Sequence, residues 1–182
     1  MADSSPTLVT VTTTYLHLPS REHFRPALLD DRDVLVMEAR EPLPEFYRFL
    51  YDAVGRGYAW IDRLPWSDEQ LRTYLLRPSV TVLPLYVRGT PAGYIELDAD
   101  PEQDEGPGTE IFYFGLIPAF HGRGLGKHLL SVGVARAFDD GASRVWVNTC
   151  SLDGPHALPN YQARGFIPYK TVTHEQLVES RE

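Results

Sequence analysis

The order of hydrophobic and polar residues along the chain predicts strands in six places. Each of these runs is rich in β-branched or aromatic residues. They occupy residues 8–18, 79–89, 92–100, 109–117, 144–150 and 166–174. Gly89-Thr90-Pro91 joins two of the runs as a hairpin-like connection. We therefore expect the three consecutive strands between residues 79 and 117 to pair antiparallel.

Four other segments repeat their apolar residues at helical spacing, and they occupy residues 42–55, 66–76, 124–141 and 157–165. The expected buried face of the first helix carries Phe46, Phe49, Leu50 and Ala53. Ser67 and Gln70 have the spacing of a capping box at the start of the second helix. Pro78 is expected to end that helix near Arg77. Pro159 lies in the first turn or two of the last helix, and we expect it to delay or kink that helix.

The alternation of these elements predicts an α/β (mixed α+β) fold. We expect a mixed, largely antiparallel sheet of six to seven strands, flanked by about four helices on its two faces. A chain of 182 residues falls within the range of about 100 to 200 residues that is usual for one domain. The sequence has no internal repeat and no linker long enough to divide it. Residues 1–182 are therefore expected to form a single domain.

The composition argues against some classes of binding partner and of cellular location. The net charge of −8 opposes binding to nucleic acid, and no apolar run approaches the ~20 residues that cross a membrane. The chain starts with acidic and hydroxyl residues where a secretory signal would be basic, and its lone Cys150 cannot form an internal disulfide. These features favour a cytoplasmic location. Cys150 itself is either buried filler or a nucleophile, and the first is the more common role of a lone thiol.

Acidic residues gather in a stretch from Gly89 to Gly122 that contains no Lys or Arg. They are Glu96, Asp98, Asp100, Glu102, Asp104, Glu105 and Glu110. This stretch is either a solvated loop or part of a site that attracts cations. The histidines show no metal-ligand spacing with Cys150 or with each other, so we expect no metal.

A glycine-rich turn follows the strand that ends near Leu116. Gly122, Gly124 and Gly126 lie between that strand and the next helix. Glycine backbone can approach a ligand closely, and the start of a helix adds partial positive charge, so the turn is suited to a diphosphate. It is not a P-loop, because Lys127 is followed by His128, and its glycines recur every second residue rather than as G-x-G-x-x-G. Taken alone, the glycines fit a plain tight turn equally well.

Two motifs together resemble the GNAT superfamily of acetyl-CoA-dependent N-acetyltransferases. The family's pyrophosphate turn reads Q/R-x-x-G-x-G/A, and residues 116–126 match it, with His121 in the place of the usual Gln or Arg. Residues 157–166 are similar to the family's A-x-x-x-Y-x-x-x-G-F helix. The two matches cover roughly the C-terminal half of the chain and occur in the expected order, which is more specific than either motif alone.

The resemblance implies acetyl-CoA as co-substrate and assigns a catalytic pair. Acetyl transfer needs a neutral amine, so a base must accept a proton, and Glu110 stands where many family members carry a glutamate base. Tyr161 would protonate the departing CoA thiolate. Glu96 on the neighbouring strand could serve as the base through water instead. The alternatives are a solvated carboxylate at a strand edge for either glutamate, and a core residue for Tyr161.

The same resemblance implies the binding residues. The cofactor-binding residues would be Leu116, Ile117, His121, Gly122, Arg123, Gly124, Leu125, Gly126, Lys127 and Asn160. A backbone N–H near Leu116 would meet the thioester carbonyl, where strands 111–116 and 145–149 are expected to splay. Substrate contacts would come from Glu96, Trp60 and Trp66, although aromatic residues in that region more often belong to the core.

The expected function is transfer of an acetyl group from acetyl-CoA to a primary amine, on a small molecule, a peptide or a protein. A CoA-binding sensor without catalysis is an alternative, and an interaction domain with a decayed site is a third hypothesis. No nucleic acid or membrane partner is expected, and formation of a homodimer is left open. The sequence does not identify the acceptor amine or the preferred acyl chain.

Overall fold

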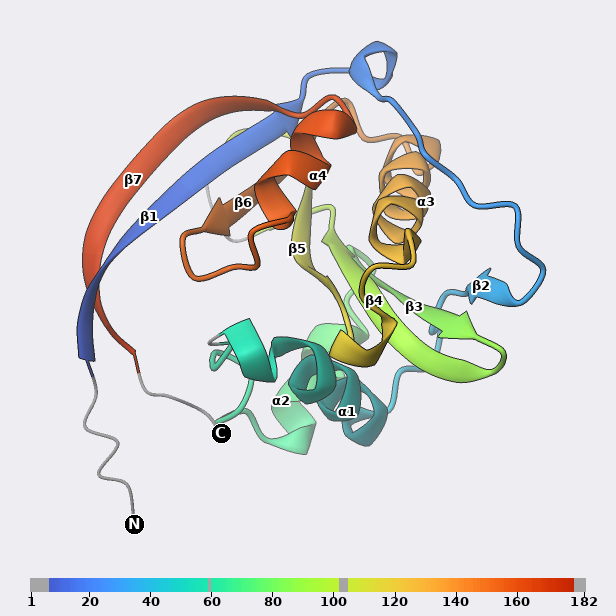
Figure 1. The fold of residues 1–182 in the computed structure, drawn as a ribbon. Helices are drawn as coiled ribbons and strands as arrows, with labels where there is room; N and C mark the ends of the chain where they lie inside the picture. The colour runs from blue at the N-terminus through green and yellow to red at the C-terminus, as the bar shows by residue number, and fades with distance from the viewer. Residues whose placement is uncertain (1–6, 59, 102–104, 179–182) are drawn as a thin grey trace.

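Seven strands form one sheet in the residues that the computed structural model describes, which are 7–58, 60–101 and 105–178. The strands are β1 (Thr7–Leu18), β2 (Val34–Val36), β3 (Val80–Val87), β4 (Thr90–Asp98), β5 (Thr109–Leu116), β6 (Val145–Cys150) and β7 (Ile167–Val178). Their spatial order is β2-β3-β4-β5-β6-β1-β7 (Figure 1). Every neighbouring pair is antiparallel except β5 and β6, which are parallel. The predicted mixed, largely antiparallel sheet is confirmed.

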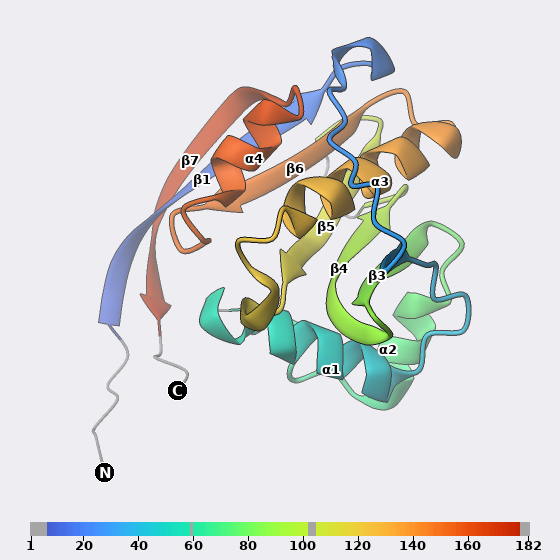
Figure 2. The same ribbon diagram turned by 45° about the vertical axis from the view of Figure 1, so that its right-hand side comes forward.

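Helices cover both faces of the sheet. The α-helices are α1 (Pro44–Gly55), α2 (Asp68–Leu75), α3 (Leu125–Asp139) and α4 (Ala157–Ala163). Short 3-10 turns lie at η1 (Arg21–His23), η2 (Arg56–Tyr58) and η3 (Pro118–Phe120). Helices α1 and α2 pack against one face, and α3 and α4 against the other (Figures 1 and 2). In the described part of the chain, no helix is both long enough and apolar enough to cross a membrane.

The β5–β6 pair separates after three residues. Thr109 to Ile111 pair with Val145 to Val147, and the two strands are unpaired beyond that point. On its other side, β5 contains a bulge at Phe112, because Tyr113 pairs with Glu96 while Ile111 pairs with Leu97. A bulge bends its strand and increases the local twist. The bend coincides with the start of the separation, so it helps to open the predicted gap between β5 and β6.

Helix ends follow the sequence closely. Gln70 N–H donates to Ser67 Oγ at 3.2 Å and Ser67 N–H donates to Gln70 Oε1 at 2.8 Å, which is the predicted capping box. Pro159 neither delays nor kinks α4, contrary to expectation, because the helix already begins at Ala157. Pro159 therefore falls in the first turn, where backbone N–H groups have no partner within the helix.

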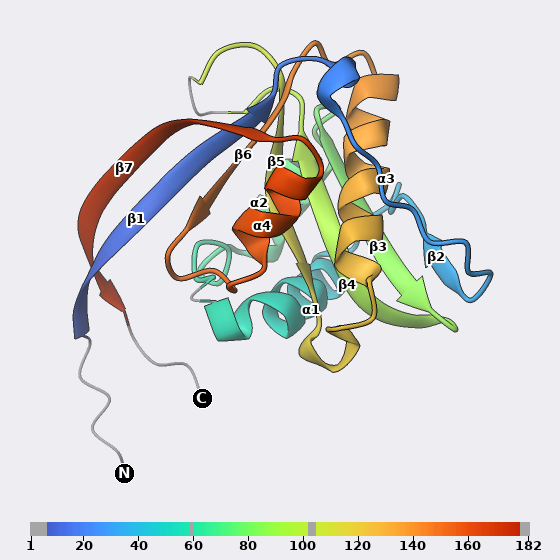
Figure 3. The same ribbon diagram turned by 45° about the horizontal axis from the view of Figure 1, so that its top comes forward.

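Three features differ from the sequence-based expectation. Strand β2 lies within a polar segment where no strand was predicted. The last strand extends four residues beyond 174, and its end forms a two-stranded ribbon with the start of β1 (Figure 3). The buried face of α1 carries Tyr47, Leu50, Tyr51 and Val54, whereas Phe49 is 49% exposed. The buried face of α1 is therefore rotated from the predicted one, because the rings of Tyr47 and Tyr51 are buried.

Candidate active site

The glycine turn places backbone donors at the start of α3. Gly122 and Gly124 both have a φ of 74°, a region that favours glycine. Gly124 is the N-cap of α3 and has no side chain that could cap the helix. The first backbone N–H groups of α3 therefore lack partners within the helix and can bind an anion. This arrangement fits the diphosphate of CoA.

Two basic side chains flank the turn. The Lys127 ammonium lies 3.9 Å from the position that a Cβ on Gly124 would occupy, so this side chain folds back over the turn. The Arg123 guanidinium lies over the Phe120 ring, 5.4 Å from its centroid. Neither residue forms an ion pair with a described carboxylate. Both charges are therefore available to phosphate groups.

His121 points toward the end of β5. Its Nε2 lies 3.0 Å from the Leu116 carbonyl oxygen, a hydrogen bond in which the ring donates. The next N–H along the chain, that of Ile117, donates to Ala92 on the β4 side at 2.9 Å. Because backbone groups alternate along a strand, the Leu116 N–H faces the opposite side, toward the gap between β5 and β6. That N–H is suited to meet a carbonyl oxygen held in the gap.

Helix α4 brings its two predicted residues to the same gap. The Asn160 amide nitrogen lies 4.0 Å from the Cβ position of Gly126, and Leu116 Cδ1 lies 3.7 Å from it. Tyr161 is 5% exposed, and its ring packs between Phe114 and Phe166. No described residue forms a hydrogen bond with the Tyr161 hydroxyl. Burial, reinforced by the charge of Asp153, raises the pKa of Tyr161, so the hydroxyl keeps its proton at neutral pH.

Glu110 lies beside the point where the gap opens. It pairs with Asp98 on β4 and with Trp146 on β6, one residue before the last β5–β6 pair. The residue is 1% exposed, and its Oε2 has no hydrogen-bond partner in the described part of the chain. Burial, followed by the charges of Asp98, Glu96 and Glu105, raises the pKa of Glu110 to about 8. This carboxyl can therefore exchange a proton close to neutral pH.

Nearby acids differ from Glu110 in having a basic partner. Asp98 lies 3.2 Å from Arg77, and Glu105 pairs with Lys170. Glu96 is fully buried. The hydroxyl groups of Tyr47 and Tyr74 each donate a hydrogen bond to its carboxylate at 2.6 Å. The Arg63 guanidinium lies 3.9 Å from the same carboxylate. Glu102 and Asp104 lie outside the described residues. Three of the acids, Glu96, Asp98 and Glu110, thus have buried side chains in the sheet and do not belong to a solvated loop.

The two predicted aromatic contacts occupy different places. Trp60 packs on Tyr113, and its ring lies 3.8 Å from the Cβ position of Gly115, next to the splayed end of β5. Trp66 instead packs on Tyr74, and Arg63 stacks on it at 4.0 Å. Trp66 and Tyr74 also line a separate cavity along α2. Of the predicted substrate residues, only Trp60 lies at the gap; a substrate contact by Trp66 or by the buried Glu96 stays a prediction.

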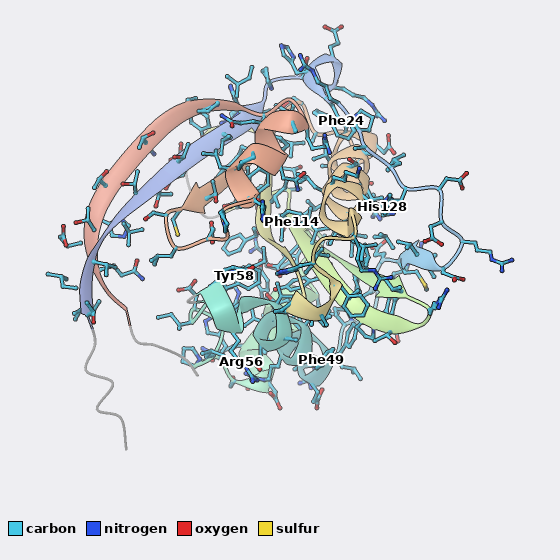
Figure 4. The ribbon with its side chains drawn as sticks, viewed as in Figure 1. Phe24, Phe49, Arg56, Tyr58, Phe114 and His128 are labelled. Carbon is cyan, nitrogen blue, oxygen red and sulfur yellow. The ribbon has the colours of Figure 1, made fainter. Side chains whose placement is uncertain are left out.

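Three further contacts lie near the site. Tyr58 stands with Trp60 and Trp66 among the aromatic residues around the first two helices, whereas the other two contacts were not predicted. Tyr58, on η2, lies below the loop between β6 and α4 (Figure 4), with ring atoms 3.3 Å from the Cβ position of Gly154. The chain between η1 and β2 runs along α3, where Leu29 N–H donates to Nδ1 of His128 at 3.0 Å. Asn148 of β6 donates to Glu110 Oε1 at 3.5 Å. These residues come from segments far apart in the sequence, and no local motif marks them.

Comparison with known proteins extends the likeness beyond the two motifs. The acetyltransferase (GNAT) family model matches residues 40–166. A GCN5-related N-acetyltransferase from Sphaerobacter thermophilus is 14% identical with a TM-score of 0.66, covering 97% of this chain and 61% of that chain. One from Kribbella flavida is 18% identical with a TM-score of 0.63, covering 93% and 59%. This chain thus spans about three fifths of the length of either protein.

A third solved structure contains a CoA compound. AAC(6')-Iy, in complex with the bisubstrate analog CoA-S-monomethyl-acetylneamine, is 18% identical with a TM-score of 0.57, covering 74% of this chain and 90% of that chain. At these identities the structures show a common fold. The family model itself spans most of the chain and includes both the glycine turn and the Tyr161 helix. The chain belongs to the GNAT family of acetyltransferases.

Proposed function

We propose that this protein transfers an acetyl group from acetyl-CoA to a primary amine by direct attack, with Glu110 as base and Tyr161 as acid. The observation that carries the proposal is the burial of Glu110 without a basic partner in the described chain. This carboxyl lies next to the opening between β5 and β6. A carboxyl that served only the fold would be expected to pair with a cation, as Glu96 and Asp98 do.

The geometry of the gap supports a set of binding residues. The N-terminus of α3, together with Lys127 and Arg123, would hold the diphosphate. Leu116 N–H would donate to the acyl carbonyl oxygen and stabilise the charge that develops there. Bound acetyl-CoA would supply the activated acyl group as a thioester.

Glu110 would remove the proton that the attacking amine must lose. A free alkyl ammonium has a pKa near ~10.4, so most of it is protonated at neutral pH. A base works best when its own pKa lies near the working pH, and the pKa of about 8 for Glu110 meets this condition. The carboxyl must be ionised to act, so its contribution should grow as the pH rises through about 8.

Tyr161 would deliver a proton to the departing sulfur. Its raised pKa keeps the phenol protonated, and no described residue occupies its hydroxyl. A hydroxyl that keeps its proton and has no partner in the described chain can donate that proton to a bound group, which supports a role as acid.

The cytoplasmic location and the single domain over residues 1–182 stay predictions, and a screen is needed to identify the acceptor. One similar structure is an aminoglycoside acetyltransferase, meta-AAC0020, in complex with sisomicin, at 18% identity. Aminoglycosides therefore belong in an acceptor screen together with polyamines, amino acids and peptides.

Two measurements test the proposal. Saturating acetyl-CoA, at about 100 times its dissociation constant, should stabilise the fold by ~2.7 kcal/mol, and an unchanged melting curve would contradict cofactor binding. Release of free thiol from acetyl-CoA should then depend on an added amine from the screen. Binding of acetyl-CoA without turnover on any amine would instead identify the protein as the CoA-binding sensor.

A further inference from the structure

We propose that Asn148 is a positioning residue, which holds the Glu110 carboxyl by one oxygen and leaves the other oxygen free for the amine. The inference rests on the proposed function, because it assigns to Glu110 the task of accepting a proton. Asn148 carries no motif in the sequence, and its place in the fold brings it to Glu110.

Asn148 lies where β5 and β6 part. The last parallel pair joins Ile111 to Val147, so Asn148 is the first residue of β6 beyond the pairing. Its side chain lies on the same face of the sheet as that of Trp146, two residues earlier, and Trp146 is in register with Glu110. Asn148 is half-buried, whereas Glu110 is 1% exposed. Asn148 thus contacts the buried carboxyl from the first position of β6 beyond the pairing.

The contact engages only one carboxyl oxygen. Asn148 Nδ2 lies 3.5 Å from Glu110 Oε1, and Glu110 Oε2 has no partner among the described residues. This hydrogen bond is long, and such contacts often tighten when a substrate binds. The arrangement gives the two oxygens different roles, one held and one available.

A neutral amide suits this task better than a cation would. Asn148 Nδ2 can donate to Oε1 whether or not Oε2 carries a proton, so the contact persists through a proton transfer. An arginine in its place would favour the ionised carboxyl and weaken it as a base. Glu96 and Asp98, in contrast, each lie beside an arginine, Arg63 and Arg77 respectively.

Trp146 is the residue of β6 in register with Glu110. Its side chain is fully buried, and its ring stacks on Tyr15 with centroids 6.4 Å apart. Its Nε1 has no hydrogen-bond partner in the described chain, as is the case for Glu110 Oε2. Two unpartnered polar atoms on adjacent, in-register residues are suited to share a water or the amine nitrogen.

The charged groups around Glu110 define what a substitution of Asn148 should change. Asp98 and Glu96 lie on β4 and Glu105 precedes β5, and all three charges raise the pKa of Glu110. Their own partners, Arg77, Arg63 and Lys170, are unaffected by a change on β6. Asn148 is the one described side chain with a hydrogen bond to the carboxyl, so its loss should act on Glu110 directly.

The test measures the Glu110 pKa without any substrate. In protein labelled with ¹³C at glutamate carboxyls, the Glu110 resonance is assigned by its loss in Glu110→Gln and is then titrated. Asn148→Leu should raise the pKa by about 1 unit, because a donor to the ionised form is lost. Asn148→Asp should raise it further by adding a like charge. Gln176→Met, a matched change from amide to apolar on β7, should leave the pKa unchanged.

Turnover separates positioning from folding. On an amine found in the screen, Asn148→Leu should lower kcat by about tenfold with an unchanged KM for acetyl-CoA, and the alkaline shift of its pH profile should match the shift in pKa. An unchanged Glu110 pKa in Asn148→Leu would overturn the inference. If that variant does not fold, the isosteric Asn148→Asp decides, and an unchanged pKa there has the same consequence.

Failure of the proposed function would look different. If Glu110→Gln kept full turnover, Glu110 would not be the base, yet the pKa shift in Asn148→Leu would still be measured. If Glu110→Gln abolished turnover while Asn148→Leu changed neither the pKa nor kcat, the function would stand and the positioning role would be wrong.

Discussion

The two faces of the sheet bury different chemistry. The core beneath α3 and α4 is aliphatic, and Tyr161 is the one tyrosine among its buried members in the described chain. Half of the buried members beneath α1 and α2 are tyrosines, which are Tyr47, Tyr51, Tyr74, Tyr94 and Tyr113. The same side buries Glu96, Asp98 and Glu110.

This difference separates two tasks. An aliphatic core provides a well-packed support for α3, whose first turn offers backbone donors to a phosphate. A core with polar groups can shift pKa values, because burial and neighbouring charges disfavour ionisation. Glu110 belongs to the second group, and Tyr161 is the one buried tyrosine of the first among the described residues.

The largest expected effect concerns the stability of the acidic face. The folded-state pKa of Glu110, about 8, lies above its ordinary value of 4.5. Glu110 therefore contributes stability below pH 4.5 that is lost as the pH rises through about 8, of order 5 kcal/mol. Glu110→Gln has no carboxyl to ionise at this position, so the variant should not lose this stability. The free energy of unfolding of the variant minus that of wild type should therefore rise between pH 5 and pH 8.5. Urea unfolding at the two pH values measures this, and an equal difference at both would contradict the buried, protonated carboxyl.

The next largest effect is the loss of turnover when the Tyr161 hydroxyl is removed from the aliphatic face. Tyr161→Phe keeps the ring contacts with Phe114 and Phe166, so fold and acetyl-CoA affinity should persist. Turnover should fall by roughly 10 to 1000 times, the range expected for a lost general acid. Tyr86→Phe on β3, a half-buried position far from the gap, serves as the control and should keep full turnover. If Tyr161→Phe kept full turnover, Tyr161 would be a residue of the hydrophobic core and not the acid.

The smallest effect tests the turn that the aliphatic core supports. Gly124→Val should raise the dissociation constant of acetyl-CoA by about tenfold or more, because a β-branched residue opposes positive φ and crowds the phosphate site. Gly141→Val is the matched control, since Gly141 also has a positive φ, of 97°, but lies just beyond the C-terminal end of α3. Both variants should lose similar stability, and only the first should lose affinity. Equal affinities in calorimetry would mean that the turn does not bind the cofactor.

The features that could be predicted from the sequence are local ones. The turn from His121 to Gly126, the capping box at Ser67 and the alternating strands each depend on residues close together in the chain. Their positions were therefore readable, and the fold and the family are confirmed. The place of β1 between β6 and β7 depends on long-range pairing, which local periodicity does not encode.

Contacts between distant segments explain what the sequence did not reveal about the site. Seven acids without a lysine or arginine nearby looked like one group, yet Arg63, Arg77 and Lys170 arrive from elsewhere to pair with three of them. The family resemblance had already singled out Glu110, and the folded chain adds that Glu110 lacks, among the described residues, the basic partner that these three neighbours have. The contact with Asn148 arises in the same way, because it joins residues on two strands that are parallel and then diverge.

The pH dependence of kcat/KM for an accepted amine, in wild type and in Glu110→Gln, tests the central claim most directly. Wild type should gain activity as the pH rises through about 8, in addition to the later rise near ~10 from the amine itself. Glu110→Gln should lose the first rise and be slower by about 100 to 10,000 times on the plateau, with unchanged acetyl-CoA affinity. A variant that retained the rise near pH 8, at wild-type rates, would show that Glu110 is not the base.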